Sequence, residues 1–98
     1  DKSPLFMVHP AGGFVYHYLP IARKLESERS LIGLQYSGQH HYKSVEEMAF
    51  HYVHEIYKIQ NHGPYLLGGH SFGGLVAYEM AKQLLIQGKE LLGLVFLD

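Results

Sequence analysis

Residues 65–74 read YLLGGHSFGG, a short apolar run that passes through two glycines and a histidine into Ser71, Phe72 and two further glycines. Apolar residues at helical spacing follow as far as Gln87, and Gly88 is suited to a left-handed cap. The segment therefore predicts a buried strand, a sharp turn at Ser71 and a helix over 72–87. Glycine is expected to be required at Gly69 and Gly73, because a side chain at either position would strike the neighbouring strand or helix.

The same alternation of apolar runs and helical segments extends along the rest of the chain. Further strands are predicted at 5–8, 31–36 and 91–97, and further helices in a segment that ends near Glu26 and in another after Ser44. Ser44 and Glu47 form a capping box at the start of the second of these helices. The apolar face of that helix is predicted to consist of Val45, Met48, Tyr52, Ile56 and Ile59. Continuous apolar strands joined by helices indicate an α/β class, with a parallel sheet covered on both faces in the order β-α-β-α-β-α-β.

Length and composition limit the classes of protein to which the chain can belong. Its 98 residues suffice for one hydrophobic core, so we expect one domain over 1–98. The chain opens on Asp1 and stops on Asp98 directly after an apolar run, so we expect it to be the N-terminal portion of a longer domain. The net charge is −1 and basic residues are scattered, which argues against a nucleic-acid or anionic-membrane partner. The longest apolar run, 91–97, is too short to span a bilayer, and the absence of cysteine agrees with a cytoplasmic location.

Open parallel sheets place their chemistry at the carboxyl ends of the strands. Three candidate sites follow, namely the loop after Val8, the turn after Gly68 and the residue after Leu97. The turn contains Gly69-His70-Ser71-Phe72-Gly73, a G-x-S-x-G sequence between a strand and a helix, which is typical of a serine nucleophile. The amide of Phe72 at the helix start would then point toward the oxygen of a reacting carbonyl. The alternative interpretation is an ordinary glycine-rich turn.

The other two candidate sites contain groups that could assist such a serine. The loop at residues 9–13 can supply a second oxyanion donor, for which the amide of Ala11 is the candidate, or it can be a structural turn. Asp98 follows the last predicted strand and can orient a histidine, or it can be a solvated aspartate. Triads on this kind of sheet run serine, acid, histidine along the chain, so Ser71 and Asp98 fit the order and no histidine of this chain does.

Together these segments resemble the thioesterase domains of nonribosomal peptide synthetases and polyketide synthases, which have the α/β-hydrolase fold. The resemblance covers nearly the whole chain and rests on residues 4–13, 33–35, 44–48, 63–74, 77–81 and 97–98. It implies that Ser71 is the nucleophile, that Asp98 is the triad acid, and that the amides of Ala11 and Phe72 form the oxyanion hole. It also implies that the triad histidine, the later strands and the lid follow beyond this chain, so we expect the 98 residues alone to be inactive.

The function implied by the resemblance is that of a serine thioesterase. Such an enzyme releases an acyl or peptidyl chain from the phosphopantetheine thioester of a carrier protein, by hydrolysis or cyclisation, through an acyl-enzyme on Ser71. The expected partner is therefore an acyl or peptidyl carrier protein, and neither a metal nor an organic cofactor is expected.

Three alternatives stay open: another esterase of the same fold, a hydrolase-like module that only docks a partner, and a nucleotide-binding α/β unit. The last is disfavoured because residues 68–74 contain neither G-x-G-x-x-G nor P-loop spacing. His51 and His54 lie three positions apart on a predicted helix but lack a third ligand, so a solvated face is favoured there over a metal site.

Overall fold

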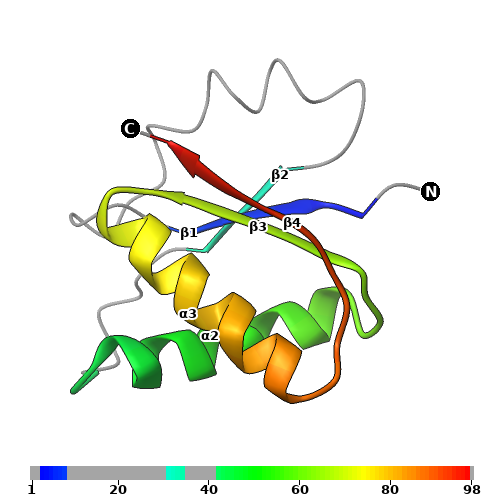
Figure 1. Cartoon of the computed structure of the whole chain (residues 1–98), viewed down its shortest axis with the longest axis horizontal. Coiled ribbons are helices and arrows are strands. Elements are labelled where there is room, and N and C mark those ends of the chain that lie inside the picture. The colour runs from blue at the N-terminus through cyan, green and yellow to red at the C-terminus, as the bar shows by residue number, and fades with distance from the viewer. Residues whose placement is uncertain (1–2, 9–30, 35–41, 98) are drawn as a thin grey trace.

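The computed structural model describes residues 3–8, 31–34 and 42–97 of the chain (Figure 1). These ranges form β1 (Leu5–Val8), β2 (Leu31–Leu34), α2 (Val45–Ile59), β3 (Tyr65–His70), α3 (Phe72–Ile86) and β4 (Leu91–Leu97). The strands predicted at 5–8 and 91–97 are confirmed, and the strand predicted from position 31 is confirmed as far as 34. Positions 35–36, the predicted loop at 9–13 and the predicted helix that ends near Glu26 lie outside the described residues.

All strand pairs of the described sheet are parallel, and the strand order is β2-β1-β3-β4. β1 therefore lies between two partners, and its Leu5 pairs with Leu31 on one side and with Leu66 on the other. All four residues of β1 are buried, as expected for a continuous apolar strand covered on both faces. The predicted parallel α/β sheet is confirmed.

Both described helices lie against the same face of the sheet (Figure 1). Alternate strand residues, among them Phe6, Val8 and Leu67, point to this face and share one core with buried side chains of α2 and α3. Leu5 and Met7 alternate with them and are also buried, so the opposite face of β1 is covered as well. Neither α2 nor α3 is long and apolar enough to cross a membrane.

The predicted helix start at Ser44 is confirmed. Ser44 is the N-cap residue of α2, and its hydroxyl oxygen accepts a hydrogen bond of 3.1 Å from the Glu47 amide. The reciprocal half of the capping box differs from the ideal pattern, because the Glu47 carboxylate accepts from the Lys43 amide at 3.4 Å. The helix therefore begins where its local sequence predicts.

The predicted apolar face of α2 is correct in its middle and wrong at its end. Tyr52 and Ile56 are buried, whereas Ile59 is 55% exposed. The buried stripe runs through positions 49, 52, 53 and 56, and a period of 3.6 residues carries it on to position 60. Gln60 occupies that position as the C-cap residue, so Ile59 lies beside the stripe and faces solvent.

The predicted left-handed cap at Gly88 is confirmed, with φ 79°. The amides of Lys89 and Gly88 donate to the carbonyls of Leu84 and Leu85, over 2.9 and 3.0 Å, which is the Schellman pattern. A Cβ at Gly88 would meet nothing within 4 Å. The positive φ, and not crowding, is therefore the reason for glycine at this position.

Candidate active site

The turn between β3 and α3 consists of a single residue, Ser71. His70 is the last residue of β3 and Phe72 is the first of α3. Ser71 has φ 55° and ψ −119°, and no other non-glycine residue of the described ranges has a positive φ. A Cβ makes this conformation unfavourable by about 1–3 kcal/mol, and such strain persists only where the surrounding structure enforces it. The predicted sharp turn is confirmed, and it places a strained residue at the end of a parallel strand.

Ser71 is an exposed residue whose side chain does not cap α3. Serine is a common N-cap residue, and a capping serine directs its hydroxyl toward the helix amides. Ser71 makes no such side-chain hydrogen bond to α3, and the residue is exposed. The hydroxyl of this serine is therefore not used as a helix cap.

Gly69 allows α3 to approach β3 closely. A Cβ added at Gly69 would lie 2.2 Å from the carbonyl carbon and oxygen of Gly73 and 2.5 Å from the amide nitrogen of Gly74. Since these are backbone atoms, they can make room only if the first turn of α3 moves. The steric requirement predicted for the elbow glycines is confirmed at Gly69. Close packing of a helix on a strand accounts for this glycine, and no bound phosphate is needed to explain it.

The first turn of α3 is hydrogen-bonded to Ser71. The carbonyl oxygen of Ser71 accepts from the amides of Gly74 and Leu75, at 2.9 and 3.3 Å. Phe72 therefore occupies the first helical position, where an amide points out of the amino end of the helix and lies at the positive end of the helix dipole. This placement is the one predicted for an oxyanion donor.

The carboxyl ends of β1 and β4 flank the turn. Val8 pairs with Gly69, and Leu97 pairs with His70. The chain passes from β1 to β2 on one side and returns to β3 on the other, so the strand order reverses between β1 and β3, where open α/β sheets bind ligands. The three strand ends predicted to carry chemistry are thus neighbours. Ala11 and Asp98, predicted as oxyanion donor and triad acid, lie outside the described residues.

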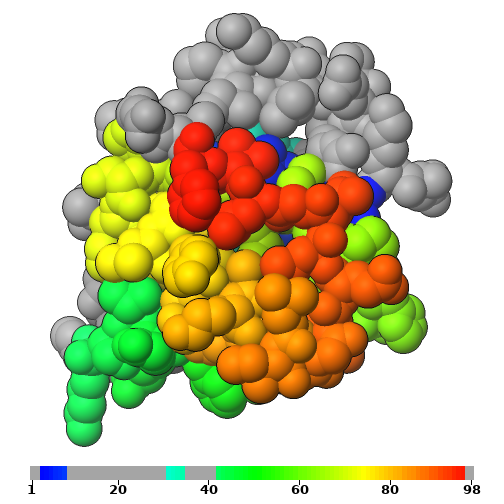
Figure 2. Space-filling view, in the orientation of Figure 1, coloured from blue at the N-terminus to red at the C-terminus, as the bar shows by residue number. Residues whose placement is uncertain are grey.

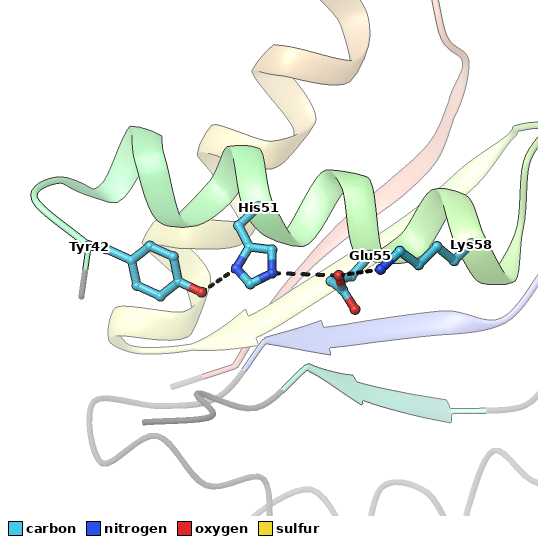
Figure 3. A network of polar contacts seen from close by, with 4 residues as sticks. All are labelled: Tyr42, His51, Glu55 and Lys58. Carbon is cyan, nitrogen blue, oxygen red and sulfur yellow. Dashed lines mark hydrogen bonds and ion pairs between the residues drawn. The ribbon is translucent and has the colours of Figure 1, made fainter. Parts of the chain in front are cut away.

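A second polar cluster, here named the α2 network, consists of Tyr42, His51, Glu55 and Lys58 (Figure 3). The Tyr42 hydroxyl and His51 Nδ1 are hydrogen-bonded to each other. His51 Nε2 lies 3.5 Å from Glu55 Oε2, and Lys58 Nζ lies 3.0 Å from the same oxygen. The hydrogen bond from Lys58 lowers the pKa of Glu55 below its ordinary value, although desolvation opposes the shift.

Sequence reasoning missed the α2 network. The four-residue spacing of His51 and Glu55 was an available signal for an interacting pair. The contact with Tyr42 carried no such signal. Tyr42 lies nine positions before His51 and precedes the helix, so helical spacing does not relate the two residues. His54 lies instead beside Phe50, with ring centroids 4.4 Å apart. In the part of the chain that the structure describes, no group of three or more potential metal ligands is found.

A family model described as Thioesterase domain matches residues 3–98 of the chain. Two relatives are large synthetases. The chain is 41% identical over 100 residues to "Inactive atromentin synthetase invA6" of Paxillus involutus, with 97% of this chain and 10% of that protein covered. It is 41% identical over 102 residues to the "Dimodular nonribosomal peptide synthase" of Bacillus subtilis (strain 168), with 100% of this chain and 4% of that protein covered.

The NocB thioesterase domain, solved as a covalent complex with a fluorophosphonate nocardicin G analog, has a similar structure. The TM-score is 0.92 at 34% sequence identity, and the match covers 100% of this chain and 46% of that one. The predicted α/β-hydrolase fold is confirmed by this similarity. The chain spans about half the length of the NocB domain and a small part of each synthetase.

Proposed function

The chain belongs to the thioesterase domain family, as its resemblance to the thioesterase domains of nonribosomal peptide synthetases predicted, and on this basis we propose that Ser71 is the nucleophile of a serine thioesterase. The substrate is an acyl or peptidyl chain held as a thioester on the phosphopantetheine arm of a carrier protein. One observation carries the proposal: a serine, not a glycine, holds φ 55° in the turn between a parallel strand and a helix. Strain of this kind is characteristic of the nucleophile elbow of serine hydrolases.

The first chemical step is attack of Ser71 Oγ on the thioester carbonyl carbon. The hydroxyl proton passes to a general base, the C–S bond breaks, and the thiol of the phosphopantetheine arm leaves with a proton. The acyl or peptidyl chain then forms an ester with Ser71. Attack on this ester by water releases a free acid, and attack by a nucleophile within the bound chain releases a ring.

We assign the oxyanion hole to the amides of Phe72 and Ala11. The first position of Phe72 in α3 supports its role, since a helix amino end stabilises negative charge that develops beside it. Ala11 follows β1, whose Val8 pairs with Gly69 next to the turn. In other serine hydrolases the loss of one such donor costs about 3 kcal/mol of transition-state stabilisation.

We assign Asp98 as the acid that orients the general base. Asp98 follows β4, and the last residue of β4 pairs with His70, directly before the nucleophile. The base itself is a histidine outside this chain, in agreement with the order serine, acid, histidine of this fold. Under the proposal, the nucleophile, the acid and both oxyanion donors are all residues of this chain.

The carrier protein is proposed from the kind of relatives that the chain matches. The Bacillus subtilis relative is a dimodular nonribosomal peptide synthase, of which the chain covers 4%. We infer that a thioesterase domain within so long a synthetase receives its substrate from another part of the same assembly. A substrate tethered to a carrier arm has a high effective concentration at the site, which favours this mode of delivery over diffusion of a free thioester.

The test is turnover of an acyl-pantetheine thioester by the full-length protein, beside a matched oxygen ester. We expect turnover of the thioester, together with covalent labelling of the protein by a fluorophosphonate, and we expect Ser71→Ala to abolish both. Ser3→Ala is the matched control, because the Ser3 hydroxyl donates to the Pro64 carbonyl at 2.9 Å and lies away from the turn. Labelling that survives Ser71→Ala would contradict the proposal, and turnover of the oxygen ester alone would indicate an esterase of the same fold.

A second candidate is a hydrolase-like module that docks a partner without catalysis. One observation favours it, namely that the Paxillus involutus relative at 41% identity is a synthetase described as inactive. A folded full-length protein that shows neither turnover nor fluorophosphonate labelling would support this candidate against the thioesterase.

A further inference from the structure

An aromatic side chain of β4 lies against the first turn of α3. Phe96 pairs in register with Gly69 of β3, so its ring is on the sheet face that α3 covers. A Cβ added at Gly74 would lie 3.0 Å from Phe96 Cδ1 and 3.5 Å from Phe96 Cε1. Few Cβ atoms in proteins approach a neighbour so closely. The Phe96 ring therefore leaves little room at Gly74 for any side chain larger than a hydrogen.

The position that Phe96 contacts is linked directly to Ser71. The Gly74 amide donates to the Ser71 carbonyl over 2.9 Å, and the Leu75 amide donates to the same oxygen over 3.3 Å. From the other side, the space beside Gly69 is so narrow that its added Cβ would lie 2.5 Å from the Gly74 nitrogen. Gly74 is thus confined between β3 and the Phe96 ring, and any displacement of it moves the hydrogen bonds that end at Ser71.

We propose that Phe96 is a positioning residue for the nucleophile: its ring, in contact with Gly74, holds the first turn of α3 in place and thereby maintains the backbone conformation of Ser71. The inference rests on the proposed function of Ser71. A strained backbone relaxes unless both of its ends are fixed. β3 fixes the amino side of Ser71, and the first turn of α3, held by Phe96, fixes the carboxyl side. Phe96 acts through Gly74 and is assigned no contact with substrate.

Within residues 1–98, Phe96 is 56% exposed. Leu92 of the same strand is 51% exposed. Leu92 lies near the amino end of β4, whereas Ser71 follows the carboxyl end of β3. Leu92 therefore provides a control of matched exposure on the same strand.

The first experiment measures the rate constant for covalent labelling of Ser71 by a fluorophosphonate in the full-length protein, well below its melting temperature. We expect Phe96→Ala to slow labelling about 10-fold, since displacement of a reacting group by a fraction of an ångström has effects of this size. Phe96→Leu keeps an apolar group against Gly74 and is expected to restore the rate to within about 2-fold of the parent. Leu92→Ala is expected to label at the parental rate.

The second experiment uses Gly74→Ala alone and combined with Phe96→Ala. Alanine is a better helix former than glycine, so a slower rate in Gly74→Ala without a lower melting temperature points to displacement and not to unfolding. The crowding needs both partners. The double variant is therefore expected to label no more slowly than the slower single variant, and the two effects are not additive.

The outcomes separate the inference from the function on which it rests. Parental labelling rates in Phe96→Ala, with or without a lower melting temperature, would overturn the positioning role. If Phe96→Ala does not fold, a parental rate in Gly74→Ala overturns it instead. A parent protein that is not labelled at Ser71 would overturn the proposed nucleophile, and with it the inference.

Discussion

Ser71 has a side chain and a backbone with opposing requirements. Its φ of 55° suits glycine, yet glycine carries no hydroxyl. Serine supplies the hydroxyl and retains the unfavourable contacts of a Cβ in this conformation. The residue therefore lowers the stability of the fold at the place where the proposed chemistry occurs, as expected for a site selected for reactivity.

Replacement of Ser71 by glycine should increase stability relative to replacement by alanine. Both variants lack the hydroxyl, but only alanine keeps the Cβ, so we expect Ser71→Gly to be more stable than Ser71→Ala by about 1–2 kcal/mol. Urea denaturation of the two variants measures the difference. At Lys82, an exposed position inside α3, the order should reverse by about 1 kcal/mol, because glycine is the poorer helix residue. Equal stability of the two Ser71 variants would show that the turn is unstrained.

The residues of the elbow differ in how far the sequence could predict them. The turn at Ser71 and the crowding at Gly69 follow from a pattern of five consecutive residues, so they were predictable. The contact between Phe96 and Gly74 depends on which strand lies beside β3 and in what register. Nothing within either local segment specifies that register, and the contact could not be predicted.

At the scale of the element, α2 shows how local signals fix the ends of a helix better than the face that it buries. The capping residue Ser44 determines the start through one hydrogen bond to a residue three positions on. The buried face depends on the elements that cover the helix. Ile59 was assigned to that face by spacing alone, but α2 ends there and the stripe continues toward Gln60. The contact of Tyr42 with His51 could not be predicted from helical spacing either, because Tyr42 lies before α2 and His51 lies within it.

The α2 network should make a small contribution to stability that disappears in acid. The folded-state pKa of Glu55 lies below its ordinary value, so ionised Glu55 favours the folded state above the unfolded pKa. This contribution is lost as the pH falls below the ordinary pKa of glutamate and through the lower folded-state pKa. The Glu55 side chain is 40% exposed, and surface pairs of this spacing contribute only about 0.3–0.5 kcal/mol.

We therefore expect Glu55→Gln to be slightly less stable than the parent at pH 7, with the difference shrinking as acid protonates Glu55 in the folded state. Chemical denaturation at low ionic strength from pH 7 downward measures it. Glu90→Gln, at an exposed carboxylate outside the α2 network, is the chemical control. A difference that does not shrink as the pH is lowered would contradict the assigned cause.

At the scale of the whole molecule, β4 and α3 each expose several apolar side chains in the part of the chain that the structure describes. β4 has a single strand partner in the described sheet, and it exposes Leu92, Val95 and Phe96. Figure 2 shows β4 and α3 together on one face, and α3 adds Leu75 and Tyr78 to the exposed apolar residues. The sequence predicted each of these elements but not this surface, because the strand order that leaves β4 at an edge is a property of the assembled sheet.

This surface predicts self-association when residues 1–98 are produced alone. An apolar strand with an unpaired edge is a template for pairing between chains. We expect light scattering coupled to size-exclusion chromatography to show species larger than a monomer. Leu92→Lys combined with Val95→Lys should shift the population toward the monomer, whereas Phe50→Lys with Ile59→Lys, at similarly exposed positions of α2, should not. A monomeric parent chain would show that the β4 edge is blocked.

The central place of β1 has a consequence for synthesis on the ribosome. β1 emerges before both of its partners, yet its Leu5 requires Leu31 on one side and Leu66 on the other before its ladder is complete. Contacts so distant in sequence form slowly, because the intervening chain must close a long loop before any pairing stabilises it. The most buried strand of the sheet is thus the one that waits longest for its neighbours, and an arrest of translation before β3 has emerged leaves Phe6 and Val8 exposed to chaperones and to other nascent chains.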